Sequence, residues 1–243
     1  MLNIDLPYCP TCGGKNFDFK RVVWNQLAED WELNERERLL IDVQQGYYCV
    51  ECYSNLRLMN IANGILKNFE SEHFCLSEFI KTRKAKNLKI LDVNGLGPIS
   101  DVLSQLKNYI RLDYPNIDLL NTKNITSKFD LVLHSDTLEH IPTPERALKN
   151  CFELLCLGGS LIFTVPIILT KLSRSREGMD LSFHGEHSTK ANDYIVHSEF
   201  GADFPNFIYM AGIKQYYVTS LTGEHSFCYI IKNGNSKKGF KWL

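Results

Sequence analysis

From about Asn87 onward, short apolar runs alternate with amphipathic segments, and this alternation constrains the fold more than any other feature of the chain. Strand patterns that are each followed by a helix pattern are typical of an open, mainly parallel sheet. Pro144 suits a first helical turn, and Gly158 and Gly159 suit a helix end. We therefore predict an α/β fold. The predicted strands are 89–93, 109–112, 129–133 and 160–165, and the predicted helices are 98–106 and 144–156.

The last part of this region shows β-type runs without a helix pattern between them. Two β-type runs, 213–220 and 226–232, lie on either side of Leu221-Thr222-Gly223-Glu224. Two such runs around a short polar turn predict an antiparallel hairpin. The sheet is therefore expected to be mainly parallel and to end in this hairpin.

Four of the eight cysteines form two C-x-x-C pairs near the start of the chain. Each pair can turn around one metal ion and supply two thiolates, so two pairs complete a tetrahedral zinc site. Four thiolates leave no open coordination position, which predicts a structural zinc ion and not a catalytic one. The predicted ligands are Cys9, Cys12, Cys49 and Cys52, and the other cysteines, in apolar sequence, are expected in the core.

The segments around the cysteine pairs read as helical. Residues 28–44 carry apolar side chains at helical spacing, and a second helix is predicted over about 60–81 with a buried stripe. We expect three parts: a zinc-binding, zinc-ribbon-like module at 1–58, a linking helix at 59–86, and the main α/β domain at 87–243.

Charge and hydropathy exclude some classes of function. The 27 Lys and Arg residues balance the 28 Asp and Glu residues, so a basic footprint for nucleic acid is absent, although Lys81, Arg83, Lys84 and Lys86 form a local cluster. The longest apolar stretch, about 160–169, is too short for the roughly 20 residues of a bilayer span. We expect a cytoplasmic protein with no membrane span.

Ligand-binding side chains are expected directly after the strands, because open α/β sheets bind ligands at the carboxyl ends of their strands. Asn94, Gly95 and Gly97 follow the first strand, where glycine lets the backbone approach a ligand closely. Asp113 follows the second strand and can accept hydrogen bonds from both ribose hydroxyls. Asp118 is expected within reach of an adenine amino group.

The run from Phe129 to Pro142, with Leu138-Glu139-His140 at its centre, and the run from Gly158 to Pro166 carry a family resemblance. Residues 88–232 resemble class I S-adenosylmethionine-dependent methyltransferases, especially the subgroup with a Leu-Glu-His motif after a strand. The run from Cys49 to Arg57 is similar to a cysteine module that precedes some of these enzymes. The resemblance implies a Rossmann-like sheet and S-adenosylmethionine as cofactor. The cofactor-binding residues are then Asp92, Asn94, Gly95, Gly97, Asp113, Asp118, Ser135 and His140.

The chain departs from the family pattern at two places. Asn94 stands where the family has the first glycine of Asp-x-Gly-x-Gly-x-Gly, and Gly95 and Gly97 are displaced. The segment between the second strand and Asp118 is too short for the usual helix. A more open adenosine pocket is therefore expected.

The methyl acceptor is expected between the last parallel strand and the hairpin. A neutral histidine suits proton abstraction near pH 7, which makes His184 the first candidate base and His187 the second. The favoured prediction is methylation of a small molecule or glycan at oxygen, because the run from Pro166 to Asp203 resembles methyltransferases of polysaccharide biosynthesis. Two alternatives stay open: an RNA base methyltransferase whose zinc module grips RNA, and a non-enzymatic binding protein that retains the fold.

Overall fold

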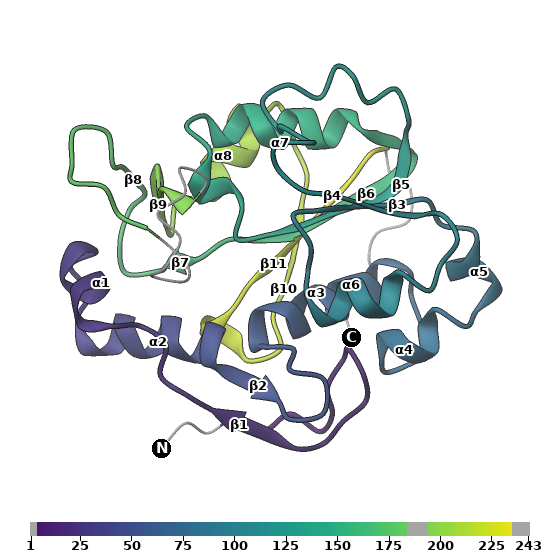
Figure 1. Ribbon diagram of the computed structural model, residues 1–243, viewed down its shortest axis with the longest axis horizontal. Coiled ribbons are helices and arrows are strands. Elements are labelled where there is room, and N and C mark those ends of the chain that lie inside the picture. Colours follow the sequence, from purple (N-terminus) through teal and green to yellow (C-terminus); the bar gives the residue numbers. More distant parts are fainter. Residues whose placement is uncertain (1–3, 184–193, 235–243) are drawn as a thin grey trace.

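The computed structural model describes residues 4–183 and 194–234, which form a central sheet with helices on both faces (Figure 1). Four strands run parallel in the order β6, β5, β3, β4, and β11 and β10 add to the β6 edge in antiparallel orientation. The predicted Rossmann-like sheet and its C-terminal hairpin are confirmed. The strands are β3 (Ile90–Val93), β4 (Tyr109–Leu112), β5 (Phe129–Ser135), β6 (Leu155–Thr164), β10 (Tyr217–Thr219) and β11 (Cys228–Lys232).

Two buried apolar clusters cover the two faces of the sheet. Helices α3, α4, α5 and α6 lie on one face, and α7 and α8 lie on the other (Figure 1). The described residues between Leu112 and Phe129 contain no helix and no strand, as the short spacing predicted. The helices are α3 (Leu56–Asn68), α4 (Leu76–Phe79), α5 (Arg83–Lys86), α6 (Pro98–Leu103), α7 (Pro144–Glu153) and α8 (Pro205–Met210).

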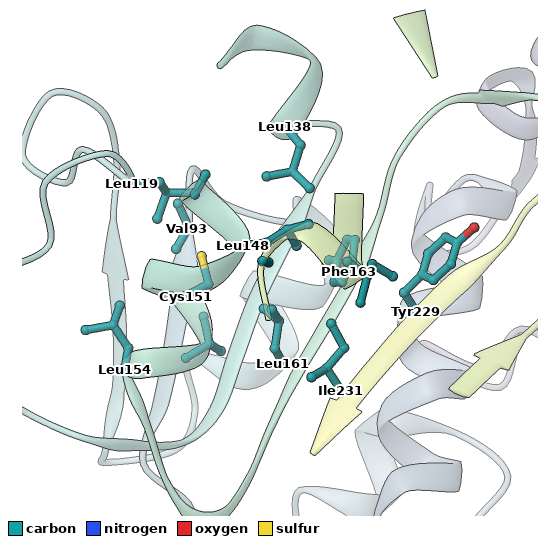
Figure 2. Packing of buried hydrophobic residues seen from close by; sticks show 14 of the residues in the cluster. Val93, Leu119, Leu138, Leu148, Cys151, Leu154, Leu161, Phe163, Tyr229 and Ile231 are labelled. Atoms are coloured by element: carbon teal, nitrogen blue, oxygen red, sulfur yellow. The ribbon is translucent and has the colours of Figure 1, made fainter. Parts of the chain in front are cut away.

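Helix α7 shows how sequence periodicity produces this packing. Leu148 and Cys151 lie three residues apart, so they share one face of the helix and point at the sheet. There they pack near Leu161 of β6 and Ile231 of β11, all fully buried (Figure 2). Burial of each such side chain stabilises the fold by about 1.5–3 kcal/mol.

The first predicted N-terminal helix is two helices in the structure, α1 (Asn25–Asp30) and α2 (Glu35–Gly46). The break falls where Glu32 takes a left-handed φ of 51°. Asn34 then begins α2 with a capping box: its side chain accepts from the Glu37 amide, and the Glu37 carboxylate accepts from the Asn34 amide. Because this reciprocal pair satisfies helix-end amides, a new start is favoured over one continuous helix.

The second predicted helix also breaks. Helix α3 ends at Asn68, Glu70 adopts a φ of 50°, and the Ser71 amide donates back to the Leu66 carbonyl oxygen at 2.9 Å. Helix α4 begins only after this turn. The apolar stripe itself is confirmed, because Ile61 and Phe79 are both buried.

Two small sheets complete the fold. Strands β1 (Phe17–Phe19) and β2 (Tyr47–Cys49) pair in antiparallel orientation beside the cysteine pairs. Strand β9 (Ser198–Gly201) pairs in parallel with β7 (Ile167–Ile168) and in antiparallel with β8 (Arg174–Ser175). Short 3-10 turns lie at η1 (Leu138–His140) and η3 (Gly223–His225). Among the described residues, no helix has the length and apolar character to cross a bilayer.

Strand β5 carries a histidine in the core. His134 is fully buried and stacks on Phe163 with ring centroids 4.8 Å apart. Neither ring nitrogen has a hydrogen-bond partner within residues 4–183 and 194–234. Burial disfavours the imidazolium and lowers the pKa of His134 to about 3.

We expect His134 to make the fold acid-sensitive. Its pKa is near 6.5 in the unfolded chain, so below that pH the unfolded state binds one more proton than the folded state. The free energy of unfolding then falls by about 1.4 kcal/mol for each pH unit between roughly 6.5 and 3. Urea unfolding of His134→Leu is measured at pH 6.5, 5.5 and 4.5. The dependence of its free energy of unfolding on pH should be weaker than in the unaltered protein by about 1.4 kcal/mol per pH unit, which corresponds to one proton. An exposed control, His73→Gln, should keep the full slope; an unchanged slope in His134→Leu contradicts the assignment.

Candidate functional site

The four predicted zinc ligands meet in one place. The Sγ atoms of Cys9, Cys12, Cys49 and Cys52 all lie within 4.8 Å of one another. The Cys9–Cys52 and Cys12–Cys49 sulfur pairs are each 3.7 Å apart. A tetrahedral zinc site with Zn–S bonds of about 2.3 Å has sulfur atoms about 3.8 Å apart, so this donor set fits one zinc ion.

Both cysteine pairs use the same local turn. The Cys9 carbonyl oxygen accepts from the Gly13 amide at 2.7 Å, and the Cys49 carbonyl oxygen accepts from the Tyr53 amide at 2.8 Å. Gly13 and Tyr53 both adopt a left-handed φ, of 86° and 61°. The turn brings the two thiols of each pair to the same side, although they are three residues apart.

The thiols of the cluster differ in how tightly they hold their protons. Burial raises the pKa of Cys49 to about 12, and a hydrogen bond from the Cys9 thiol lowers the pKa of Cys52 to about 5. With no cation present, some of the four thiols therefore keep their protons. A divalent cation would replace those protons, and the Gly14 amide already donates to Cys12 Sγ at 3.3 Å.

A cleft of about 1020 Å³ opens at the carboxyl ends of β3, β4 and β5. Pockets for one small ligand measure about 300–1,000 Å³, so this cleft lies at the large end of that range. Six of the eight predicted cofactor-binding residues line it: Asn94, Gly95, Asp113, Asp118, Ser135 and His140.

The turn after β3 keeps the backbone shape that a glycine motif provides. Asn94, Gly95 and Gly97 have φ values of 65°, 75° and 51°. Asparagine tolerates the left-handed region better than other residues with a Cβ. Its side-chain oxygen accepts from the Tyr114 amide at 2.9 Å, which ties the turn to the end of β4. The Asn94 departure is therefore compatible with an intact turn.

Asp92 and Gly97 do not line the cleft. Asp92 is fully buried, and its Oδ2 accepts from the Ser100 hydroxyl at 2.5 Å and from the Tyr109 hydroxyl at 2.6 Å. Ser100 in turn accepts from the Leu96 amide at 2.6 Å. Burial raises the pKa of Asp92. The structure therefore places Asp92 behind the turn, where it shapes the backbone, and Gly97 at the start of α6.

The acidic residues after β4 face different neighbours. Asp113 accepts from the Arg111 guanidinium at 2.8 Å, and that guanidinium lies over Gly95, where a Cβ would come within 2.4 Å of it. A larger residue at position 95 would have to displace this guanidinium and would be strained at the φ of 75°, so glycine suits the position best. Asp118 accepts from the Leu120 amide at 2.8 Å and stabilises its own loop.

A polar network at the end of β5 was not predicted. Arg57 of α3 donates to the Ser135 hydroxyl at 2.6 Å and lies 3.4 Å from the Asp136 carboxylate. Gln45 of α2 donates to the same carboxylate at 2.6 Å. These four residues all line the cleft, so the N-terminal helices contact the predicted cofactor edge directly.

Two histidines of the described chain line the cleft, His140 and His197. His140 Nδ1 lies 3.0 Å from the Ile195 carbonyl oxygen, and its Nε2 lies 3.8 Å from the buried Glu139 carboxylate, so protein groups hold both ring nitrogens. The His197 amide donates to the Glu139 carbonyl oxygen at 2.7 Å. Burial and the nearby His140 lower the pKa of His197, which keeps its ring neutral near pH 7.

The two predicted base candidates, His184 and His187, lie outside the described residues. Their role stays a prediction. His197 belongs to the sequence stretch that was expected to cover the acceptor, but nothing in the pattern singled it out.

Comparison with known proteins agrees with this architecture. A family model described as "Methyltransferase domain" matches residues 96–163, from the turn after β3 through β6. The chain is 29% identical over 77 residues to ubiquinone biosynthesis O-methyltransferase of Coxiella burnetii, which is 30% of this chain and 33% of that protein. The chain thus spans about one third of the length of the curated relatives it matches.

Solved structures give a weak overall match. One is an S-adenosylmethionine-dependent methyltransferase from Clostridium acetobutylicum, with a TM-score of 0.42 and 16% identity over 66% of this chain and 91% of that chain. Another is human N-acetylserotonin methyltransferase in complex with SAM, with a TM-score of 0.39 and 12% identity over 74% of this chain and 56% of that chain.

Proposed function

We propose that the protein is an S-adenosylmethionine-dependent methyltransferase that acts on a small molecule. The observation that carries the proposal is the cleft at the carboxyl edge of the sheet, where the left-handed turn after β3 meets the acid after β4. The methyltransferase-domain match begins at residue 96, at the end of this turn, covers the next strands up to residue 163, and supports the same activity. S-adenosylmethionine would supply a methyl group on a sulfonium: the acceptor atom would bond to the methyl carbon in line as the carbon–sulfur bond breaks, and S-adenosylhomocysteine would leave.

The residues of the cleft suit this cofactor in different ways. The backbone at Gly95 carries no side chain of its own and can approach the ligand closely where the half-exposed Arg111 guanidinium, which lies over it, moves aside. Asp113 and Asp118 would accept hydrogen bonds from ribose hydroxyls and from the adenine amino group. Arg111 would have to share Asp113 with the ribose, since the two side chains are paired across the turn.

We further propose oxygen as the methylated atom. A hydroxyl acceptor must lose its proton as the new bond forms, and a neutral histidine at the cleft can accept that proton. His197 is the described residue best placed for this role, with His184 and His187 as rivals. The acceptor would belong to polysaccharide or secondary-metabolite biosynthesis in the cytoplasm, in line with the resemblance found in the sequence.

The RNA alternative gains no support. The basic cluster falls on and next to α5, and Figure 1 shows α5 at the far side of the molecule from α1 and β8. Lys81 of this cluster pairs with Glu78 at 2.7 Å, and Lys84 donates to the Phe69 carbonyl oxygen at 2.7 Å. These basic side chains therefore have local partners, and the cluster follows α4, whose Leu76 amide donates to the Pro10 carbonyl oxygen of the first cysteine pair at 2.7 Å.

Asp113→Ala is expected to weaken binding of S-adenosylhomocysteine by about 1.5–3 kcal/mol, because the ribose loses a charged acceptor. The Arg111–Asp113 pair is half exposed and contributes little to stability, so the variant should fold. Thermal-shift titrations of both proteins measure the difference. Asp101→Ala, an exposed acid on α6, is the control and should bind normally. Equal affinity of all three proteins would remove Asp113 from the site.

Methyl transfer itself can be tested with labelled S-adenosylmethionine. The protein is incubated with a panel of phenols, catechols and simple sugars, and label in the organic and aqueous products is counted. Labelled ether product from at least one hydroxyl acceptor is the expected result. Transfer only to amines would overturn the oxygen assignment.

A further inference from the structure

We propose that the segment between the two cysteine pairs, residues 20–45, forms the acceptor-binding wall of the cleft and selects an uncharged acceptor with an apolar ring. This inference rests on the proposed function and names the substrate class of the same site. The proposal also gives the cysteine module a role in substrate binding, because the module anchors both ends of this wall.

The side chains with which this segment lines the cleft are mostly apolar. Val23, Leu27 and Ile41 are themselves buried, and the half-buried Val22 and Trp24 offer the apolar surface to a ligand. Ten of the 26 residues at 20–45 are charged, yet Lys20 is the one charged residue of the segment among the described cleft-lining side chains. The cofactor-binding residues come from β3, β4 and β5, so this apolar surface is left for a second ligand. The segment contributes Lys20, Val22, Val23, Trp24, Leu27, Ile41 and Gln45 to the lining.

The two ends of the segment are fixed at the cysteine cluster. Strand β1 precedes it and pairs with β2, which ends at the metal ligand Cys49. Within the segment, the Asp42 carboxylate accepts from the amides of Val22 and Val23 at 2.7 and 2.8 Å. These hydrogen bonds hold the extended stretch before α1 against α2. The wall is therefore fixed in place by its own contacts.

The far side of the segment packs on the β7–β9 insertion. Trp31 donates from its indole nitrogen to the Ser182 hydroxyl at 3.0 Å, and Lys171 donates to the Trp31 carbonyl oxygen at 2.7 Å. Leu27 and Trp31 share one buried apolar cluster with Ile168. Figure 1 shows α1 and α2 facing this insertion across one end of the sheet. The wall is therefore braced against the part of the chain that carries His197.

The near side contacts the cofactor edge. Gln45 of the wall and Arg57, which follows the second cysteine pair, both bind the Asp136 carboxylate at the end of β5. These contacts fix the distance between the wall and the sheet. An acceptor bound on the wall would therefore face the cofactor across the cleft, with His197 beside it.

The chemistry of the lining decides the acceptor class. An indole and several aliphatic side chains favour a flat apolar body, because burying it removes apolar surface from water and allows ring stacking. A sugar could stack one face on the indole, but its many hydroxyl groups would find only Lys20 and Gln45 of this segment as hydrogen-bond partners, and unpaired hydroxyls are costly to bury. Of the two acceptor classes proposed above, the wall thus favours a ring-bearing hydroxyl compound of secondary metabolism over a glycan.

Calorimetric titrations with two neutral probes test the inference. 2-Naphthol and methyl α-glucoside are each titrated into the full-length zinc-loaded chain, with and without S-adenosylhomocysteine. We expect saturable binding of 2-naphthol and no binding of methyl α-glucoside. Trp24→Ala should weaken 2-naphthol binding at least tenfold and leave S-adenosylhomocysteine binding unchanged. Val22→Asp, which places a charge on the wall, is the second variant in case Trp24→Ala does not fold.

The control is Leu39→Ala, which removes an exposed apolar side chain from the same segment outside the cleft, and should bind 2-naphthol normally. Binding of methyl α-glucoside in preference to 2-naphthol, or equal 2-naphthol affinity in all variants, would overturn the inference. If the unaltered chain does not bind S-adenosylhomocysteine, the proposed function is contradicted. The titrations of 2-naphthol and methyl α-glucoside without S-adenosylhomocysteine then still test whether residues 20–45 bind the acceptor.

Discussion

Cys49→Ser is expected to lose zinc and to destabilise the whole N-terminal part of the chain. Structural zinc contributes of the order of 10 kcal/mol or more to folding in small cysteine modules, because the ligands assemble only in the folded state. Cys49 is also the last residue of β2, so loss of the metal releases the strand pair at the base of residues 20–45. We expect substoichiometric zinc by elemental analysis, and either insolubility or a much lower unfolding temperature.

Cys156→Ser is the matched control for this variant. Its thiol is half buried and lies 3.3 Å from Asp130, remote in sequence from the four clustered sulfurs. This variant should keep one zinc ion per chain and nearly full stability. If unaltered protein purified without added metal holds no zinc, and if all eight thiols react freely in its folded state, the metal assignment is wrong.

His197→Ala should lower turnover by about 10²–10⁴ on a hydroxyl acceptor, the usual contribution of a positioned base. The ring lines the cleft, and burial together with His140 lowers its pKa. The base must be neutral, so the rate should fall with decreasing pH at a midpoint below the ordinary histidine value of about 6.5. Steady-state rates between pH 5 and 8, with affinity for S-adenosylhomocysteine measured alongside, test this.

Two further variants separate the rival assignments. His73→Ala changes an exposed histidine and should have no effect. His184→Ala tests the base predicted from the sequence. Full turnover in His197→Ala together with an inactive His184→Ala would move the base to His184, and normal turnover in both variants would remove the histidine base from the mechanism.

The sheet and the clustering of the four cysteines were predictable because their signals are largely local. Alternating strand and helix patterns define β3 to β6, and each C-x-x-C pair brings its own two thiols together through its turn, while the pairing of β1 with β2 joins the two pairs. The break between α1 and α2 was also readable in principle. Asn34 followed by Glu37 is a capping-box pattern, but the apolar spacing across residues 28–44 masked it.

The composition of the cleft was only partly predictable. Asn94, Asp113 and Ser135 follow strands, and the sheet brings strand ends together regardless of loop details. Arg57 and Asp136 are 79 residues apart and meet only because α3 packs on the sheet beside β5. His197 is held at the cleft by the hydrogen bond from its amide to the Glu139 carbonyl oxygen. This tertiary contact cannot be predicted from the spacing of residues in the sequence.

Calorimetric titration of the zinc-loaded protein with S-adenosylmethionine tests the central claim, that the cleft at the carboxyl edge of the sheet binds this cofactor. We predict saturable binding of one molecule per chain, competition by S-adenosylhomocysteine, and weaker binding by Gly95→Ala, whose added Cβ would meet the Arg111 guanidinium. The absence of heat and of any thermal shift at millimolar ligand, in protein that is folded and holds its zinc, would contradict the account.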